Sequence, residues 1–239
     1  SYATGAVSAA AFAGGLLGQL TTSGSVARAY ATGSASAGDG NEGGIAGLVD
    51  TGASFSATLW DTDASGLTDA VGFSYDPTVP GVTGLTGAQM TQLSTFTAYG
   101  FNIDDEGATG AVWRIYDGYT TPLLRGFMTG LSVTGGSVSK VYDGSAASSD
   151  VGTLVYGGPY DGSRIFGTAS YLAANADAGT YTGGNLTLAG LYSGQFGYDL
   201  TLESGSLAIT PATLWVTAND LWRRCADPWL FPQRTGRRR

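Results

Sequence analysis

Small and apolar residues alternate in short segments along the N-terminal part of the chain, and Gly or Ser-Gly pairs separate these segments. The segments are Tyr2–Ser8, Gly15–Gln19 and Ser25–Tyr30. A period of two is typical of β-strands, and Gly is typical of turns. The pattern therefore predicts short strands joined by tight turns.

The segments belong to a repeat. Tyr2 has its counterpart in Tyr30, and Ser25 has its counterpart in Ser54 at nearly the same spacing. A third copy begins at Leu59-Trp60, where the residues have changed. The repeated stretches are 2–5 with 30–33, 14–18 with 43–47, and 25–26 with 54–55.

One such unit cannot bury its apolar face alone, whereas stacked units bury it and pair their backbone edges. We therefore expect residues 1–84 to form the coils of a β-solenoid, similar to a parallel β-helix. Ala and Gly suit its narrow interior, and Val, Leu, Ile and Phe fill it. A flexible Gly/Ser linker is the alternative, but the apolar positions repeat in register.

Large side chains become dense in residues 85–130. Thr86 is placed to begin a short helix over 86–91, and Phe96, Phe101 and Trp113 follow it. Exposed end coils invite pairing with other strands. We therefore expect this segment to be an end-cap of the solenoid.

A new pattern begins at Leu131 and continues to residue 213. Short runs of strand-forming residues are separated by turn residues such as Asp143-Gly144 and Ser204-Gly205. The candidate strands are Ser137–Tyr142, Gly152–Tyr156, Arg164–Tyr171, Gly179–Tyr181, Leu186–Leu191, Tyr198–Glu203 and Ser206–Thr210. This spacing predicts a small antiparallel β domain.

The C-terminal stretch, 214–239, differs from the rest. Leu214–Thr217 resembles a strand that begins another module of the same kind. Six of the eleven Lys and Arg residues lie in Arg223–Arg239. Because the composition changes abruptly, we interpret residues 221–239 as a non-native, Arg-rich end. A basic tail that binds nucleic acid or an anionic surface is the alternative.

Composition and charge limit the possible functions. The chain has no His, which removes the commonest general base and the commonest zinc ligand. Its single cysteine, Cys225, cannot form an intramolecular disulfide. The stretch 1–222 holds five Lys and Arg against eighteen Asp and Glu, which disfavours nucleic acid as a partner. No apolar run reaches the roughly 18 residues that a membrane span needs. The fold class predicted is all-β.

The repeats resemble the GLUG motif of filamentous-haemagglutinin-like bacterial exoproteins. The matching segments are Tyr-Ala-Thr-Gly at 2–5 and 30–33, and the Gly-Gly stretches at 14–18 and 43–49. The segment Trp-Asp-Thr-Asp-Ala-Ser-Gly follows them at 60–66. Residues 131–211 look like the YDG-type module of the same proteins, through the words at 140–144, 177–181 and 207–211.

The resemblance implies a secreted, cell-surface adhesin of Gram-negative type, exported through an outer-membrane partner. Such a protein acts in adhesion or aggregation, with surface glycans or proteins as its partners and no catalytic residues. A glycan-binding or glycan-cleaving β-helix protein is the alternative function.

Few residues offer site chemistry. Asp61, Asp63, Ser65 and Asp69 have the spacing of the first half of an EF-hand loop, but the twelfth position is Gly72. Calcium could bind weakly there, although a solvated turn explains the same residues. Asp104-Asp105-Glu106 is a second acidic cluster with the same two interpretations. Asp61 with Asp63, or Asp104 with Asp105, could be nominated as the carboxylate pair of glycoside cleavage, but acidic residues that are close in sequence do not by themselves make such a site.

Tyrosines are numerous in the C-terminal half, and they allow two interpretations. Exposed aromatic faces bind sugars, whereas rings packed across strands stabilise the fold. We favour packing. The tyrosines are Tyr142, Tyr156, Tyr160, Tyr171, Tyr181, Tyr192 and Tyr198.

Overall fold

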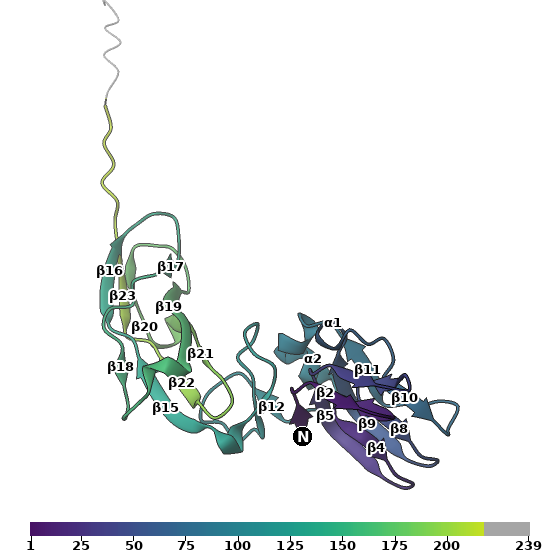
Figure 1. Cartoon of the computed structure of the whole chain (residues 1–239). Helices are drawn as coiled ribbons and strands as arrows, with labels where there is room; N and C mark the ends of the chain where they lie inside the picture. The colour runs from purple at the N-terminus through teal and green to yellow at the C-terminus, as the bar shows by residue number, and fades with distance from the viewer. Residues whose placement is uncertain (218–239) are drawn as a thin grey trace, which may run out of the picture.

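A computed structural model describes residues 1–217, and these residues form an all-β molecule of two lobes (Figure 1). The first lobe contains the repeat and the segment that follows it, and the second lobe begins with β15 (Thr129–Thr134). The lobes meet at one corner, so that the molecule is bent in Figure 1. None of the helices within residues 1–217 has the length and apolar character needed to span a bilayer.

The first lobe is built from parallel strands. Their bounds are β1 (Tyr2–Ala3), β2 (Val7–Ala9), β3 (Phe12–Gly14), β4 (Leu17–Leu20), β5 (Ser25–Ala31), β6 (Ala35–Ala37), β7 (Asn41–Gly43), β8 (Ala46–Val49), β9 (Ser54–Asp61), β10 (Val71–Ser74) and β11 (Val82–Leu85). They form four small parallel sheets, in the orders β1-β5-β9-β11, β10-β8-β4, β2-β6 and β3-β7.

The register of these sheets follows the sequence repeat. Tyr2 pairs with Tyr30, and Ser25 pairs with Ser54, as the repeat spacing predicts. The third copy is in register too, because Tyr30 pairs with Leu59. The strands are therefore stacked by equivalent positions, and the expectation of strands in this region is confirmed.

Alternate residues of β5 and β9 face opposite sides. Ala31 and Trp60 lie in an inner cluster with Ile45 and Val49. The space there is narrow: a Cβ on Gly44 would overlap the Trp60 ring. Small residues are needed because neighbouring backbones approach closely.

The opposite side of this sheet is covered by residues 86–127. These residues contain the 3-10 turns η1 (Gln89–Thr91) and η2 (Arg125–Phe127), the helix α2 (Leu93–Ala98), and the strands β12 (Ile103–Asp104), β13 (Trp113–Arg114) and β14 (Leu123–Leu124). The helix expected over 86–91 with Thr86 as its cap is instead the 3-10 turn η1, whose N-cap is Ala88, although Thr86 Oγ1 accepts a hydrogen bond from Gln89 N–H at 3.3 Å. A separate one-turn helix, α1 (Thr62–Ser65), follows β9.

This covering segment is not confined to the end of the repeat. Trp113 contacts both Tyr2 of β1 and Tyr30 of β5, with ring centroids 6.1 and 5.9 Å apart. Phe96 packs edge-on against Tyr30 at 5.9 Å. The expected end-cap therefore packs along the flank of the stack, because the outward column of Tyr2, Tyr30 and Leu59 is apolar and must be covered.

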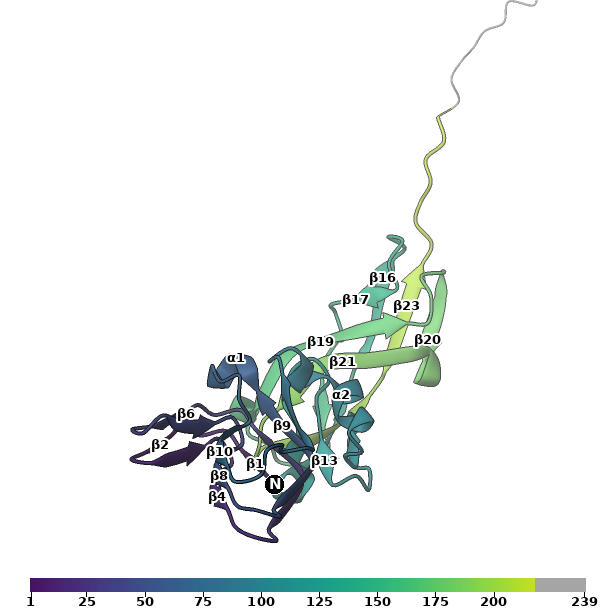
Figure 2. The same cartoon turned by 90° about the vertical axis from the view of Figure 1, so that its right-hand side faces the viewer.

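The second lobe holds most of its strands close to where the sequence predicts them. Their bounds are β15 (Thr129–Thr134), β16 (Ser137–Val141), β17 (Ala147–Ser148), β18 (Val155–Tyr156), β19 (Ile165–Ala173), β20 (Gly179–Thr182), β21 (Leu186–Ser193), β22 (Tyr198–Glu203) and β23 (Ser206–Thr210), with 3-10 turns η3 (Gly162–Arg164) and η4 (Gly183–Asn185). The strands β15 and β17 were not predicted. Figure 2 shows β19 and β21 side by side along this lobe.

The expected antiparallel domain is wrong for the centre of the lobe. β15 pairs with β22 in parallel, and β16 pairs with β23 in parallel, whereas the pairs β19–β21, β17–β19, β15–β18 and β20–β23 are antiparallel. The register offset is the same on both sides of Gly135-Gly136, because Thr134 pairs with Glu203 and Ser137 pairs with Ser206. Ser204-Gly205 is thus a break through which the strand continues, and not a hairpin turn.

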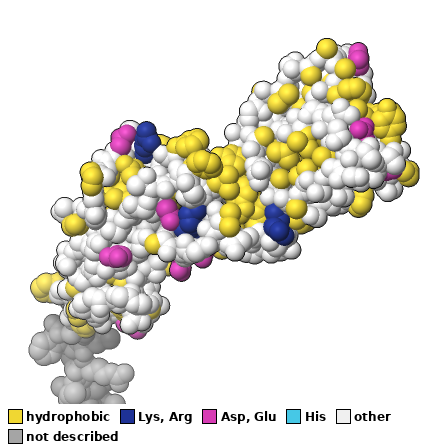
Figure 3. All heavy atoms as spheres, turned by 90° about the horizontal axis from the view of Figure 1, so that it is seen from below, with side chains coloured by type: hydrophobic (Ala, Val, Ile, Leu, Met, Phe, Trp, Pro, Cys, Tyr) yellow, Lys and Arg dark blue, Asp and Glu magenta, His cyan; other side chains and the backbone are white. Residues whose placement is uncertain are grey.

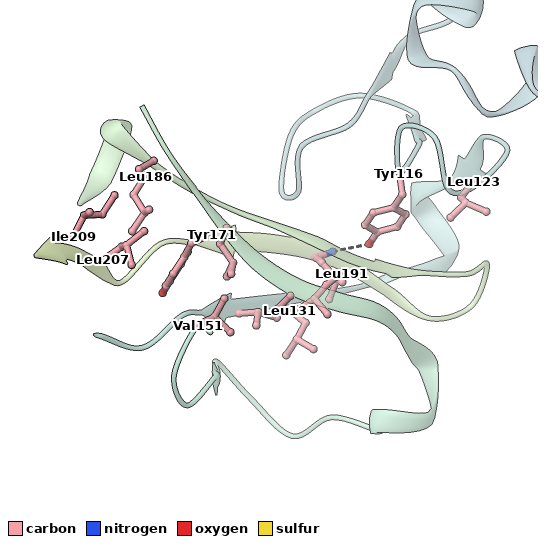
Figure 4. Close-up of a cluster of buried hydrophobic side chains, with 14 residues drawn as sticks. Tyr116, Leu123, Leu131, Val151, Tyr171, Leu186, Leu191, Leu207 and Ile209 are labelled. Atoms are coloured by element: carbon pink, nitrogen blue, oxygen red, sulfur yellow. Dashed lines mark hydrogen bonds between the residues drawn. The ribbon is translucent and has the colours of Figure 1, made fainter. Parts of the chain in front are cut away.

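Tyr171 bonds to both interruptions of the strands, at Gly135-Gly136 and at Ser204-Gly205. Its hydroxyl donates to Gly136 O at 2.7 Å and accepts from Gly205 N at 3.1 Å. Tyr171 is fully buried in the core of the lobe, among Leu131, Val151 and Leu207 (Figure 4). The central tyrosine therefore joins the two parallel pairs to the β17-β19-β21 sheet.

Residues 211–217 leave the end of the second lobe that is farthest from the first lobe (Figure 1). Leu214, Trp215 and Val216 are 80 to 88% exposed. The strand expected over Leu214–Thr217 is wrong, because among residues 1–217 no strand pairs with these residues. The interpretation of the Arg-rich end lies outside the described residues.

Candidate functional site

A buried ion cluster joins the lobes. Asp199 of β22 accepts from Arg125 Nη1 at 2.6 Å, and its other oxygen lies 3.3 Å from Arg114 Nε. The second contact is an ion pair without hydrogen-bond geometry. The side chains of Arg114, Arg125 and Asp199 are 3, 11 and 8% exposed, so removing the single carboxylate would leave two buried cations.

Tyr116 adds a second contact across the same junction. Its hydroxyl donates to Tyr198 O at 2.6 Å. The same hydroxyl accepts from Leu200 N at 3.0 Å, the bond that is dashed in Figure 4. The Arg114 guanidinium lies 4.1 Å from the ring centroid. Burial raises the pKa of Tyr116, which keeps its hydroxyl a donor.

Gln195 fixes the turn between β21 and β22 to the first lobe. Its amide donates to Leu124 O at 3.0 Å and accepts from Leu124 N at 2.8 Å. The same oxygen accepts from the Tyr2 hydroxyl at 2.9 Å. Three hydrogen bonds from the first lobe therefore hold this turn of the second lobe in place.

Phe196, the next residue, has a costly conformation. The turn closes through Gly197 N–H to Gly194 O at 3.0 Å, and Phe196 has a φ of 64° in its third position. Gly or Asn usually occupies such a position, because a bulky side chain is strained there. The ring is nevertheless 66% exposed, so burial in the core does not compensate for this strain.

Phe196 belongs to a set of five aromatic rings at the junction, in which Phe196 contacts Phe127, and Tyr192 contacts both Tyr119 and Phe166. Phe127 lies 5.8 Å from Phe196, and Tyr119 stacks on Tyr192 at 4.9 Å, while Phe166 lies 5.6 Å from Tyr192. Phe166 and Tyr192 are cross-strand partners and so share one face of their sheet. We call these five side chains the aromatic row. Its most exposed members are Phe196, Phe127, Tyr119 and Phe166, at 66, 59, 55 and 45%.

Two pockets lie against the aromatic row. One has a volume of about 360 Å³ between Phe166 and Phe196, with Arg164 on its wall. The other has a volume of about 480 Å³ and lies beside Tyr119, with Asp105, Glu106 and Asp117 among its lining residues. Figure 3 shows hydrophobic side chains gathered on the underside of the molecule where the two lobes meet.

The structure does not bring the calcium candidates together as a metal site. Asp61 caps α1, with its Oδ1 accepting from Asp63 N and Ala64 N at 3.0 Å each, and Ser65 Oγ donates to Asp61 O. Asp63 accepts from Gly87 N at 2.8 Å, and Asp69 is exposed. Within the described residues, no group of three or more carboxylate, His or Cys side chains is placed to hold a metal ion.

The tyrosines of the C-terminal half were expected either to pack across strands or to expose their rings for sugar binding, and the structure contains both buried and exposed examples. Tyr171 is a core residue, and Tyr156, Tyr181, Tyr192 and Tyr198 are half-buried against the core. Tyr142 and Tyr160 are 46 and 47% exposed. Packing is thus the main role, although Tyr192 also belongs to the aromatic row.

Sequence reasoning missed four members of the aromatic row: Tyr119, Phe127, Phe166 and Phe196. They come from three separate segments, and only the fold places them together. The segment Gly-Gln-Phe-Gly at 194–197 could have pointed to Phe196, because a large aromatic residue inside a Gly-flanked turn is unusual.

Comparison with protein-family models, with curated proteins and with solved structures found no match to the chain. The class that the fold itself defines is an all-β protein with a repeated parallel stack and a mixed β lobe.

Proposed function

We propose that this chain is part of a secreted adhesin of the Gram-negative cell surface, in which it acts as a structural stalk and adhesive module without catalysis. The observation that carries the proposal is the register of the repeat. Tyr2 pairs with Tyr30, and Ser25 pairs with Ser54. The sequence segments that resemble the GLUG motif therefore lie in the repeat units that stack on one another.

The stack supports a finer proposal, that residues 1–84 are coils of a β-solenoid. Within residues 1–217, β1 and β4 are edge strands of their parallel sheets. A further coil of the same kind would pair with these edges and extend the stack. Such an array is stiff because each coil is bonded to its neighbours.

The second lobe has a topology suited to a spacer between neighbouring modules of the stalk. Its first and last strands run parallel, and the chain leaves at the end farthest from the first lobe. Modules of this topology can follow one another in a line. Surface glycans or proteins would be bound through several weak contacts, which gain strength from repetition. Export would use an outer-membrane partner.

Glycan cleavage has less support as the alternative. Asp61 accepts backbone N–H groups at the start of α1, Asp63 accepts from Gly87 N, and Asp104 Oδ1 accepts from Glu106 N at 2.8 Å. These carboxylates stabilise local turns, and a catalytic pair would need to face a common substrate.

Adhesion can be measured directly. Beads coated with the full chain are expected to be retained on layers of bacterial or animal cells, and soluble chain is expected to compete for this retention. Beads coated with an unrelated all-β protein of similar size are the control. Retention no greater than the control would contradict the proposal.

A further inference from the structure

We propose that the aromatic row, Tyr119, Tyr192, Phe166, Phe196 and Phe127, is a binding site for an uncharged oligosaccharide. This inference rests on the proposed surface function and names the ligand class and its site. The sugar rings would stack on the exposed aromatic faces, and their hydroxyls would bond to polar groups in the two adjacent pockets.

The conformation of Phe196 is the first argument. A bulky residue at positive φ is destabilising, and Gly in this turn would avoid that strain. The ring is exposed and touches another exposed ring, Phe127, so the core gains little from it. Strain kept at an exposed side chain points to binding.

The preorganisation of the site is the second argument. Gln195 ties the turn to Leu124, and Arg164 Nη1 donates to Phe196 O at 2.7 Å. Tyr119 is stacked on Tyr192 with an interplanar angle of 22°. Rings that are already fixed lose little entropy when a ligand binds.

The charges around the row select the ligand class. Asp105, Glu106 and Asp117 line one pocket, and their carboxylates accept hydrogen bonds from hydroxyl groups. The acidic surface of residues 1–222 repels anionic lipids and sulfated chains. A row of flat rings with acceptors beside it matches a sugar, which has an apolar face and a rim of hydroxyls.

One pocket lies within the row, between Phe166 and Phe196, and the other lies beside Tyr119 at one end of it. The pocket between Phe166 and Phe196 has room for a compact group, and the pocket beside Tyr119 is larger. We therefore expect several linked sugar units to bind along the row, and a monosaccharide to bind far more weakly.

The test uses the full chain on an array of neutral, sialylated and sulfated oligosaccharides, followed by calorimetric titration of the best ligand. Phe196→Gly is expected to weaken binding by about tenfold or more, as for a central aromatic contact. Its thermal midpoint is expected to be unchanged or raised, because the substitution removes strain. A structural role would predict a lowered midpoint.

Tyr75→Ser is the matched control, because Tyr75 is 64% exposed in the first lobe and lies outside the row. It is expected to bind like the unmodified chain. Equal loss in both variants, or no binding of any neutral oligosaccharide by the unmodified chain, would overturn the inference. A preference for sulfated chains that disappears with added salt would overturn it too.

The bead assay separates this failure from failure of the proposed function. If beads are retained on cells, and retention survives enzymatic removal of surface glycans, the adhesin proposal stands and the oligosaccharide inference is wrong. If retention is lost with the glycans and is reduced by Phe196→Gly, both are supported.

Discussion

Gly44 shows at the scale of one residue why this chain is so rich in glycine. The ring of Trp60 occupies the space that a Cβ on Gly44 would need. Trp60 is itself fixed, because its indole N–H donates to Leu67 O at 3.1 Å and its ring is buried among the strands of the stack. The glycine and the tryptophan form one packing unit.

Gly44→Ala is therefore expected to lower the free energy of unfolding by about 1–3 kcal/mol, the usual range for overpacking a core. Chemical denaturation followed by tryptophan fluorescence measures it. Gly18→Ala is the control, because a Cβ on Gly18 meets no atom within 4 Å. Equal stability of the two variants would show that the interior of the stack is looser than described.

The strand elements show what the sequence could and could not predict. The repeat spacing predicts which residues pair in the first lobe, since stacking of equivalent positions follows from repetition. The direction of pairing in the second lobe could not be predicted in this way. Ser204-Gly205 has the composition of a hairpin turn, yet the strand continues through it because Tyr171 bonds both breaks.

The aromatic row was beyond prediction for a similar reason. Phe127 and Phe196 lie far apart in the sequence and meet only because Gln195 and Asp199 join the lobes. The tyrosine count predicted ring packing in the second lobe, which Tyr171 confirms. The calcium candidates at Asp61 and Asp63 had a local pattern that a helix start and a turn explain.

Tyr171→Phe tests the parallel elements. It removes a hydroxyl that satisfies Gly136 O and Gly205 N–H, and leaving buried groups unsatisfied costs about 1–3 kcal/mol. The expected result is a lower denaturation midpoint with an unchanged slope. Tyr142→Phe, at a ring that is 46% exposed, should match the unmodified chain. An unchanged denaturation midpoint in Tyr171→Phe would contradict a stabilising role for the bonds from Tyr171 to Gly136 and Gly205.

The whole molecule depends on the junction between the lobes. Arg114 and Arg125 approach Asp199 from the first lobe, Tyr116 bonds the backbone of β22, and Gln195 bonds Leu124. These contacts are buried or half-buried, so they resist solvent better than surface pairs. The proposed stalk would need such a joint, because a flexible linker would not transmit orientation.

Asp199→Asn is expected to loosen the joint. Breaking a buried ion cluster by removing one partner typically costs about 3–5 kcal/mol. Asp143→Asn is the control, because the pair of Lys140 with Asp143 is exposed at the carboxylate and should leave the thermal midpoint unchanged. Calorimetric melts of the two variants make the comparison, and equal midpoints would speak against a structural role for the cluster.

The most direct test of one rigid body is a distance measurement between the lobes. Spin labels would be placed at Thr22→Cys in the first lobe and Ala178→Cys in the second, both exposed, after the single cysteine is replaced by Cys225→Ser. Pulsed electron paramagnetic resonance is expected to give one narrow distance distribution, broadened by Asp199→Asn. A broad distribution in the chain with Asp199 intact would contradict the rigid stalk.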